Sequence, residues 1–202
     1  MKKVTYHHRD LRQALIDEAL VLIREKGINQ WSLREVSRRL GVSHTAPYRH
    51  FPDQQALLAA VAEEGFRQLH NQMLAGAGQS NLPADRLRGI GIAYVEYAIA
   101  HPSHYQVMFR SCPMPKYASL QAAGGQAFEV LLDTIISGQA TGHFRPGNPL
   151  ELALVAWSLV HGLAMLVIDG HLDLNFDIPA LATFSGDILL NGLLKAPSPA
   201  DD

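Results

Sequence analysis

Apolar residues recur at helical spacing along nearly the whole chain, and no segment alternates convincingly as a strand would. The spacing predicts helices over about residues 9–26, 53–74, 83–100, 102–110, 117–138 and 149–168 and from 178 onward, with two short helices between 32 and 51. Proline or a capping side chain stands at most of the predicted helix starts. The stretch AGAGQSNL, residues 75–82, is the one linker-like segment. The pattern therefore predicts an all-α fold.

Residues 32–51, SLREVSRRLGVSHTAPYRHF, predict two short helices joined by a tight turn. Ser32 and Glu35 have the N-cap and N3 spacing of a capping box. Gly41 can adopt the left-handed conformation that ends a helix at a sharp corner. A second short helix is expected from about Ser43. This arrangement is a helix-turn-helix, in which the second helix can lie in a DNA major groove.

Charge is distributed unevenly along the chain, although the net formal charge is only −2. Residues 1–51 hold ten Lys and Arg against five Asp and Glu, a net of +5, whereas residues 52–202 hold seven against fourteen, a net of −7. The basic part coincides with the predicted helix-turn-helix. We therefore expect one surface that faces phosphates and an acidic body that faces something else.

Length and composition set further bounds. A chain of 202 residues with 48% apolar content can bury a substantial core in one or two domains. The single Cys112 excludes an internal disulfide and fits a reducing cytoplasm, and no signal peptide is found. The apolar stretch 152–168 is short for a membrane span and contains polar residues, so we interpret it as a buried helix with no membrane partner.

The segment from Leu11 to Val61 resembles the DNA-binding domain of TetR/AcrR-type bacterial transcriptional regulators, with a resemblance that spans about residues 9–62. The features that carry it are a helix followed by Gly, a Ser-capped helix, a Gly-Val-Ser corner, Tyr-x-His-Phe, and a Leu-rich helix. Further on, Trp157, His161 and Gly162 match the Trp-x-x-x-His-Gly (WHG) signature of one subgroup.

The resemblance implies an all-α homodimer of about nine helices that binds a palindromic DNA operator, most often as a repressor. It divides the chain into a three-helix DNA-binding domain at 1–52, a connecting helix at 53–75, a sensing and dimerisation domain at 83–195, and a disordered tail at 196–202. The last two long helices, 149–169 and 178–195, would form the dimer interface.

The resemblance also assigns DNA contacts to the helix-turn-helix. The expected DNA-binding residues are Ser32, Arg34, Ser43, His44, Thr45, Ala46, Tyr48, Arg49 and His50. Hydroxyls and amides at helix N-termini can meet phosphates, and arginine can meet phosphate or a guanine edge. Two aromatic residues have a second interpretation: Phe51 is expected to pack in the core, and Tyr48 could either pack or bond a phosphate.

Two departures from the family pattern affect this assignment. Family members commonly carry a phosphate-binding Lys where this chain has Gln54, which predicts a salt dependence shallower by about one phosphate equivalent. Pro47 lies within the predicted recognition helix, where it lacks an N–H and is tolerated only in the first turn. We therefore expect a short, distorted first turn.

A small apolar effector is expected to bind in the C-terminal part. The candidate ligand-binding residues are Tyr94, Tyr97, Met108, Phe109, Phe128, Trp157 and His161. The competing interpretation is that these residues form an ordinary core and that His161 is a hydrogen-bonded core histidine. A dimeric DNA-binding regulator without any small-molecule ligand remains the main alternative function.

An enzyme is the remote alternative. His101 and His104 could share a helical face, but Pro102 between them and the lack of nearby carboxylates argue against a metal site. Cys112 has no convincing His partner, and neither a phosphate-binding Gly loop nor a nucleophile elbow occurs. We expect no catalytic residue, no metal and no cofactor.

Overall fold

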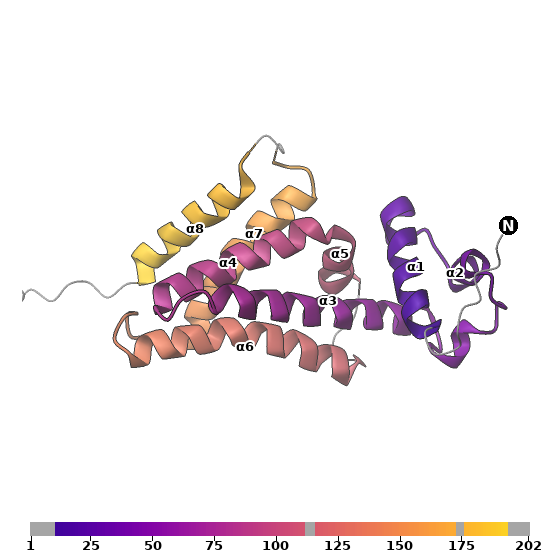
Figure 1. Ribbon diagram of the computed structural model, residues 1–202, viewed down its shortest axis with the longest axis horizontal. Coiled ribbons are helices and arrows are strands. Elements are labelled where there is room, and N and C mark those ends of the chain that lie inside the picture. Colours follow the sequence, from indigo (N-terminus) through magenta and orange to yellow (C-terminus); the bar gives the residue numbers. More distant parts are fainter. Residues whose placement is uncertain (1–10, 112–115, 173–175, 194–202) are drawn as a thin grey trace, which may run out of the picture. The chain divides into compact units, whose positions relative to one another are not determined.

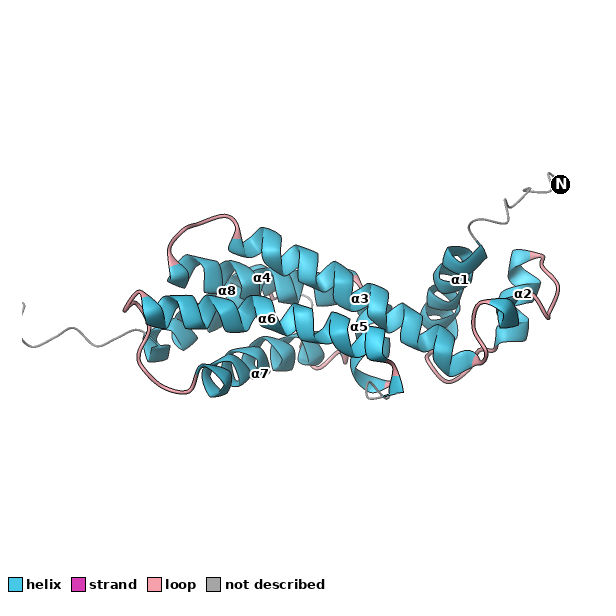
Figure 2. Ribbon diagram, turned by 90° about the horizontal axis from the view of Figure 1, so that it is seen from below, coloured by secondary structure: helices cyan, strands magenta, loops and turns pink. Residues whose placement is uncertain are grey.

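The computed structural model describes residues 11–111, 116–172 and 176–193. Within these ranges the chain forms eight α-helices and one short 3-10 helix joined by loops (Figure 1), and Figure 2 shows no strand there. The elements are α1 (Leu11–Lys26), α2 (Leu33–Leu40), η1 (Pro47–Arg49), α3 (Gln54–Ala77), α4 (Pro83–Ala100), α5 (Pro102–Arg110), α6 (Ala118–Ala140), α7 (Pro149–Ile168) and α8 (Ile178–Leu193). The predicted all-α fold is confirmed. The predicted tail at 196–202 and Cys112 lie outside the described residues.

Helix starts follow the capping signals of the sequence. The Asn148 side-chain oxygen accepts from the Leu150 amide at 3.0 Å and caps α7. Asp53 accepts from the Ala56 amide at 2.7 Å at the start of α3, and Asp177 accepts from the Ala180 amide at 3.0 Å at the start of α8. These bonds satisfy amides that have no partner inside the helix. The predicted starts of these three helices therefore agree with the observed ones.

The predicted linker at 75–82 is wrong at its first three residues, because α3 continues to Ala77. The cause is a tertiary contact between the backbones of Gly76 on α3 and Gly89 on α4. A Cβ atom on either glycine would overlap the carbonyl oxygen of the other. Glycine weakens a helix by local propensity, but here its missing side chain lets the two helices touch.

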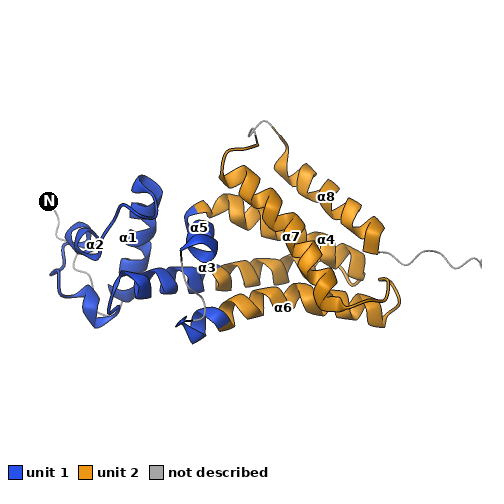
Figure 3. Cartoon of the chain, turned by 180° about the vertical axis from the view of Figure 1, so that it is seen from behind, with its two compact units in different colours: residues 1–65, 103–121 blue, residues 66–102, 122–202 orange. Residues whose placement is uncertain are grey.

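The chain separates into two compact units (Figure 3). Unit 1 comprises residues 1–65 and 103–121, and unit 2 comprises residues 66–102 and 122–202. Unit 1 therefore contains α1, α2, η1, the first half of α3, and α5. The remainder of α3 and α4, most of α6, and α7 and α8 form unit 2.

Unit 2 is organised around α4, which packs against both α7 and α8. Its core cluster consists of the buried side chains Val95, Leu163, Val167, Ile178 and Ala182. An ion-pair group also joins α4 to α8: Arg88 contacts Asp187 at 2.8 Å and Asp85 at 2.7 Å. The hydrogen bond with Asp187 raises the pKa of Arg88, so the guanidinium stays charged.

Helix α7 is only partly buried in the single chain. It is long and apolar enough to cross a membrane, yet only 28% of its 18-residue apolar window is buried. Large apolar side chains are exposed on α7 and α8, which we call the apolar face: Leu150, Leu154, Val155, Leu159, Leu166, Phe184 and Ile188. Packing within unit 2 therefore covers only part of the surface of α7, and the dimer interface predicted for this helix stays a prediction.

Candidate nucleic-acid interface

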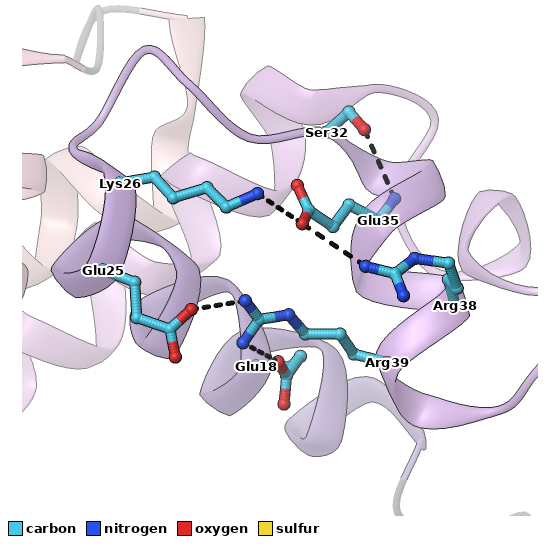
Figure 4. Close-up of polar contacts among 7 residues, drawn as sticks. All are labelled: Glu18, Glu25, Lys26, Ser32, Glu35, Arg38 and Arg39. Carbon is cyan, nitrogen blue, oxygen red and sulfur yellow. Dashed lines mark hydrogen bonds and ion pairs between the residues drawn. The ribbon is translucent and has the colours of Figure 1, made fainter.

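The start of α2 is capped as the sequence predicts, but only by half of a capping box. The hydroxyl of Ser32 accepts from the amide of Glu35 at 3.3 Å. The Glu35 carboxylate pairs instead with Lys26 of α1 at 2.5 Å (Figure 4). Trp31, just before the cap, and Val36, in the first turn of α2, are both buried. Ser32 therefore sits exposed at a fixed helix N-terminus, where anions are favoured.

The turn after α2 depends on Gly41. This residue has φ of 68° in the left-handed region, and its amide donates to the carbonyl of Arg38. The next amide, of Val42, donates to the carbonyl of Ser37 at 3.1 Å. These bonds satisfy carbonyls at the end of α2. The chain thus reverses sharply before the predicted recognition segment.

We expect Gly41→Ala to lower the free energy of unfolding by about 1 kcal/mol, because a Cβ disfavours positive φ. No atom lies within 4 Å of the added Cβ, so the cost is backbone strain alone. Gly125→Ala in α6 is the matched control, since its Cβ also meets nothing within 4 Å. There the change should stabilise the chain by about 0.5–1 kcal/mol. Urea denaturation measures the free energy of unfolding of both variants. Equal shifts of the same sign would contradict the conclusion that the positive φ of Gly41 is what disfavours alanine there.

The second helix of the helix-turn-helix is shorter than predicted. A helix from about Ser43 was expected, but residues 44–46 form a turn and only Pro47–Arg49 form the 3-10 helix η1. The Ala46 amide donates to the Ser43 carbonyl at 3.0 Å, which is the i to i+3 spacing of a tight turn. Pro47 stands in the first turn of η1 and is buried. The distortion expected from Pro47 is therefore present and extends over the whole segment.

Most of the predicted DNA-binding residues are exposed. The exposed members are Ser32, Arg34, Ser43, His44, Thr45, Tyr48, Arg49 and His50, and Ala46 is half-buried. The Tyr48 side chain is 51% exposed, which disfavours its interpretation as a packing residue. Phe51 is 3% exposed and lies beneath the guanidinium of Arg12, 5.4 Å from the ring centroid. The DNA contacts themselves stay a prediction.

Ion pairs between and within α1 and α2 occupy three of the basic side chains (Figure 4). Arg39 contacts Glu18 at 3.3 Å and also Glu25, and Arg38 lies 3.6 Å from Glu35, which binds Lys26. Arg34 and Arg49, by contrast, have no carboxylate within ion-pair distance in the described part of the chain. Sequence reasoning did not separate the paired basic side chains from the unpaired ones. The opposite charges of Glu25, Lys26, Glu35 and Arg39 could have suggested the ion pairs.

The same pairs lower the pKa values of two carboxyl groups. The hydrogen bond from Lys26 holds the pKa of Glu35 below its ordinary value of 4.5, and the bond from Arg39 does the same for Glu25. A depressed carboxyl pKa contributes stability above the unfolded-state pKa and loses it as the pH falls through the folded-state pKa.

We therefore expect the stability difference between wild type and Glu35→Gln to be full above about pH 4.5 and to vanish as the pH falls further. Urea denaturation between pH 7 and pH 3 measures this difference. Glu129→Gln, at an exposed position of α6 without an ion pair among the described residues, is the control for the loss of one carboxylate and is measured at the same pH values. A Glu35→Gln difference that stays constant down to pH 3 would refute the role of these pairs.

Gln54 has a structural role that the sequence did not suggest. Its side-chain amide donates to the carbonyl of Trp31 at 3.4 Å, and the Trp31 indole N–H donates to the carbonyl of Ile28 at 2.9 Å. Gln54 thus contacts the loop that precedes Ser32. The residue in place of the family's lysine stabilises the start of α2.

Four of the predicted ligand-binding residues form an aromatic cluster within unit 2. The Trp157 indole N–H donates to the Tyr94 hydroxyl at 3.1 Å, and that hydroxyl lies 2.9 Å from His161 Nδ1. Since the indole can only donate, the hydroxyl accepts from it and can donate its own proton to Nδ1. Phe128 packs edge-on against Trp157, with ring centroids 5.9 Å apart. The cluster joins α4, α6 and α7.

The other predicted ligand-binding residues lie elsewhere. Tyr97 on α4 is buried and packs on His101 with ring centroids 4.8 Å apart. Met108 and Phe109 are on α5 in unit 1, where Phe109 packs on Tyr105 at 4.7 Å. A cavity of about 600 Å³ occurs between α3 and α4, and its lining contains none of the predicted ligand-binding residues. Among the described residues, no group of three His, Cys, Asp or Glu side chains is placed to hold a metal ion.

Comparison with known proteins places the whole chain among transcriptional regulators. Residues 15–61 match the model of bacterial regulatory proteins of the tetR family, and residues 87–187 match a tetracycline repressor-like C-terminal domain. The HTH-type transcriptional regulator YobS of Bacillus subtilis is 24% identical over 91% of this chain and 92% of its own. The HTH-type transcriptional regulator BetI of Cronobacter sakazakii is 30% identical over 79% of this chain and 76% of its own.

A solved structure extends the similarity over the full fold. A protein of unknown function from Rhodococcus sp. RHA1 superposes with a TM-score of 0.85 at 32% identity, covering 96% of this chain and 100% of that one. The named relatives are regulators, and none of them is an enzyme. With one family model on the helix-turn-helix and a second over half of the sequence, the chain belongs to the TetR family of helix-turn-helix transcriptional regulators.

Proposed function

We propose that this chain is a cytoplasmic transcriptional repressor that binds a palindromic operator as a homodimer and is released by a small, mostly apolar effector. The observation that carries the proposal is the exposed surface around η1 and the N-terminus of α2. There, Arg34 and Arg49 are left without a carboxylate partner among the described residues, so both are available to phosphate or guanine.

The apolar face of α7 and α8 supports the homodimer. Exposed apolar side chains in a contiguous group mark interaction sites on soluble proteins. A second copy is the occupant we propose, because a two-fold axis lets one patch meet itself and gives one helix-turn-helix to each half of a palindrome. The tetracycline repressor-like match over residues 87–187 supports repression as the mode of action.

The aromatic cluster supports an effector site and the subgroup with the Trp-x-x-x-His-Gly signature. Trp157 and His161 of that signature meet around the Tyr94 hydroxyl. We propose that an apolar ligand binds against Phe128 and Trp157 and favours a conformation that no longer matches adjacent major grooves.

One observation favours a second candidate function, a dimeric DNA-binding regulator without a ligand. The indole, hydroxyl and imidazole of the cluster already satisfy one another, as in an ordinary polar core. A thermal-shift screen against apolar metabolites separates the two candidates. A ligand that stabilises the wild type but not Trp157→Ala supports the sensor.

The test of the proposal begins with selection of bound DNA from a random library, which should yield a palindrome. Calorimetric titration of an effector found in the screen, with and without that operator, then measures the coupling. We expect operator DNA to weaken effector binding by about tenfold, equivalent to about 1.4 kcal/mol, and effector to weaken operator binding by the same factor. Equal effector affinities in the two titrations would refute release by the effector.

A further inference from the structure

The cavity between α3 and α4 is not used by the proposed function. Its volume of about 600 Å³ lies within the range of small-molecule sites. All of its lining belongs to unit 2: Gln72, Ala75, Gly76, Gln79, Ser80, Asp85, Arg88, Gly89, Ile92, Ala93 and Glu96. We call it the α3–α4 groove.

The floor of the groove is apolar and is formed by the helix crossing. The backbones of α3 and α4 touch at Gly76 and Gly89, because neither glycine has a side chain to separate them. Ala75, Ile92 and Ala93 continue the apolar lining on both helices. The groove therefore offers a hydrocarbon-lined surface to its occupant.

One end of the groove carries an arginine whose charge is balanced by two carboxylates. Arg88 is the basic side chain of the lining, and it is already paired with two carboxylates: Nε donates to Asp187 at 2.9 Å and Nη1 donates to Asp85 at 2.7 Å. Nη2 also lies 2.8 Å from Asp187. The hydroxyl of Ser80 donates to the second oxygen of Asp85 at 3.2 Å. A carboxylate ligand here would meet the negative charges of Asp85 and Asp187 beside the single positive charge of Arg88, which disfavours its binding.

The other end carries an uncompensated negative charge. Glu96 is exposed, and no basic side chain lies within ion-pair distance of it among the residues that the structure describes. It stands eleven residues beyond Asp85 on α4, or about 16 Å along the helix. An occupant that reaches from the glycine crossing to Glu96 thus meets first apolar surface and then a carboxylate.

We propose that the α3–α4 groove binds an organic cation with an apolar body. The charged group lies at Glu96 beside the amide of Gln72, and the hydrocarbon part covers Ile92 and Ala93. This site is separate from the aromatic cluster and requires neither an effector there nor DNA.

The test uses the full chain and calorimetric titration with benzyltrimethylammonium, benzyl alcohol and benzoate, without DNA. We expect benzyltrimethylammonium to bind most tightly, benzyl alcohol to bind more weakly, and benzoate to bind too weakly to measure. Glu96→Gln should weaken binding of the cation about three- to fivefold, as expected for an exposed charge pair, and leave the affinity for the alcohol unchanged. Ala75→Phe, at an exposed position of α3, should fill the groove and abolish binding of both.

Two matched variants on α6 control for location. Glu129→Gln and Ala122→Phe, both at exposed positions, should bind the cation as wild type does. Far-UV circular dichroism verifies the fold of each variant, and Glu96→Gln tests the site even if Ala75→Phe fails to fold. Absence of cation binding by the wild type, equal binding of all three probes, or unchanged binding in Glu96→Gln would each overturn the proposal.

Discussion

Val155→Arg is expected to convert the dimer into monomers and to reduce operator affinity by at least a hundredfold. Val155 is 58% exposed in the single chain and lies in the apolar face of α7. In a two-fold interface the substitution enters twice, and an uncompensated buried charge costs about 3–5 kcal/mol. At about 1.4 kcal/mol per tenfold change, this cost would raise the dissociation constant of a nanomolar dimer into the micromolar range or beyond.

Sedimentation velocity measures the oligomeric state, and a gel shift with the selected operator measures the affinity. Ile136→Arg is the control, because Ile136 on α6 is 43% exposed but lies outside the apolar face. It should remain dimeric and bind normally. A Val155→Arg dimer with wild-type affinity would show that the interface lies elsewhere, and a wild-type monomer with full operator affinity would refute the dimer itself.

Replacing Arg34 and Arg49 together by Ala should weaken operator binding by about 2–6 kcal/mol. Each arginine is expected to contribute about 1–3 kcal/mol through phosphate or guanine contacts. If both contact phosphate in both subunits, the slope of log affinity against log salt should also become shallower by about 3 to 4. Fluorescence anisotropy between 50 and 300 mM salt measures both quantities.

Arg38→Ala is the control for this pair. Its guanidinium lies 3.6 Å from Glu35 and its side chain is highly exposed, so it differs from Arg34 and Arg49 in having a carboxylate partner. We expect a smaller loss of affinity from this change. If Arg38→Ala weakens binding as much as the double variant, the assignment of the interface from unpartnered arginines is wrong.

Helix positions could be predicted because the signals that set them are local. Asp53, Asn148 and Asp177 cap the helices that they were expected to begin, and Pro83 stands in the first turn of α4. The end of α3 could not be predicted, because the contact of Gly76 with Gly89 joins residues on different helices.

The candidate site was predictable in its residues and less so in its conformation. Spacing placed the cap at Ser32 and the left-handed residue at Gly41, both of which the structure has. The effect of Pro47 on the second helix was underestimated. Pro47 has no backbone N–H to donate, and the residues around it form i to i+3 hydrogen bonds, so only the 3-10 helix η1 is present. Periodicity also could not show which apolar side chains of α7 are covered by their own chain and which are left exposed, because both kinds follow the same pattern.

The ion pairs between α1 and α2 bear on how many copies of this regulator a cell needs. Lys26, Arg38 and Arg39 are engaged with carboxylates, so fewer positive charges remain to attract DNA of arbitrary sequence. Attraction to random DNA follows the number of phosphates neutralised, and a genome offers a vast excess of such competing sites. A regulator with weak attraction to them leaves more of its molecules free to find the operator. A small number of the proposed dimers per cell would then keep their proposed operator occupied.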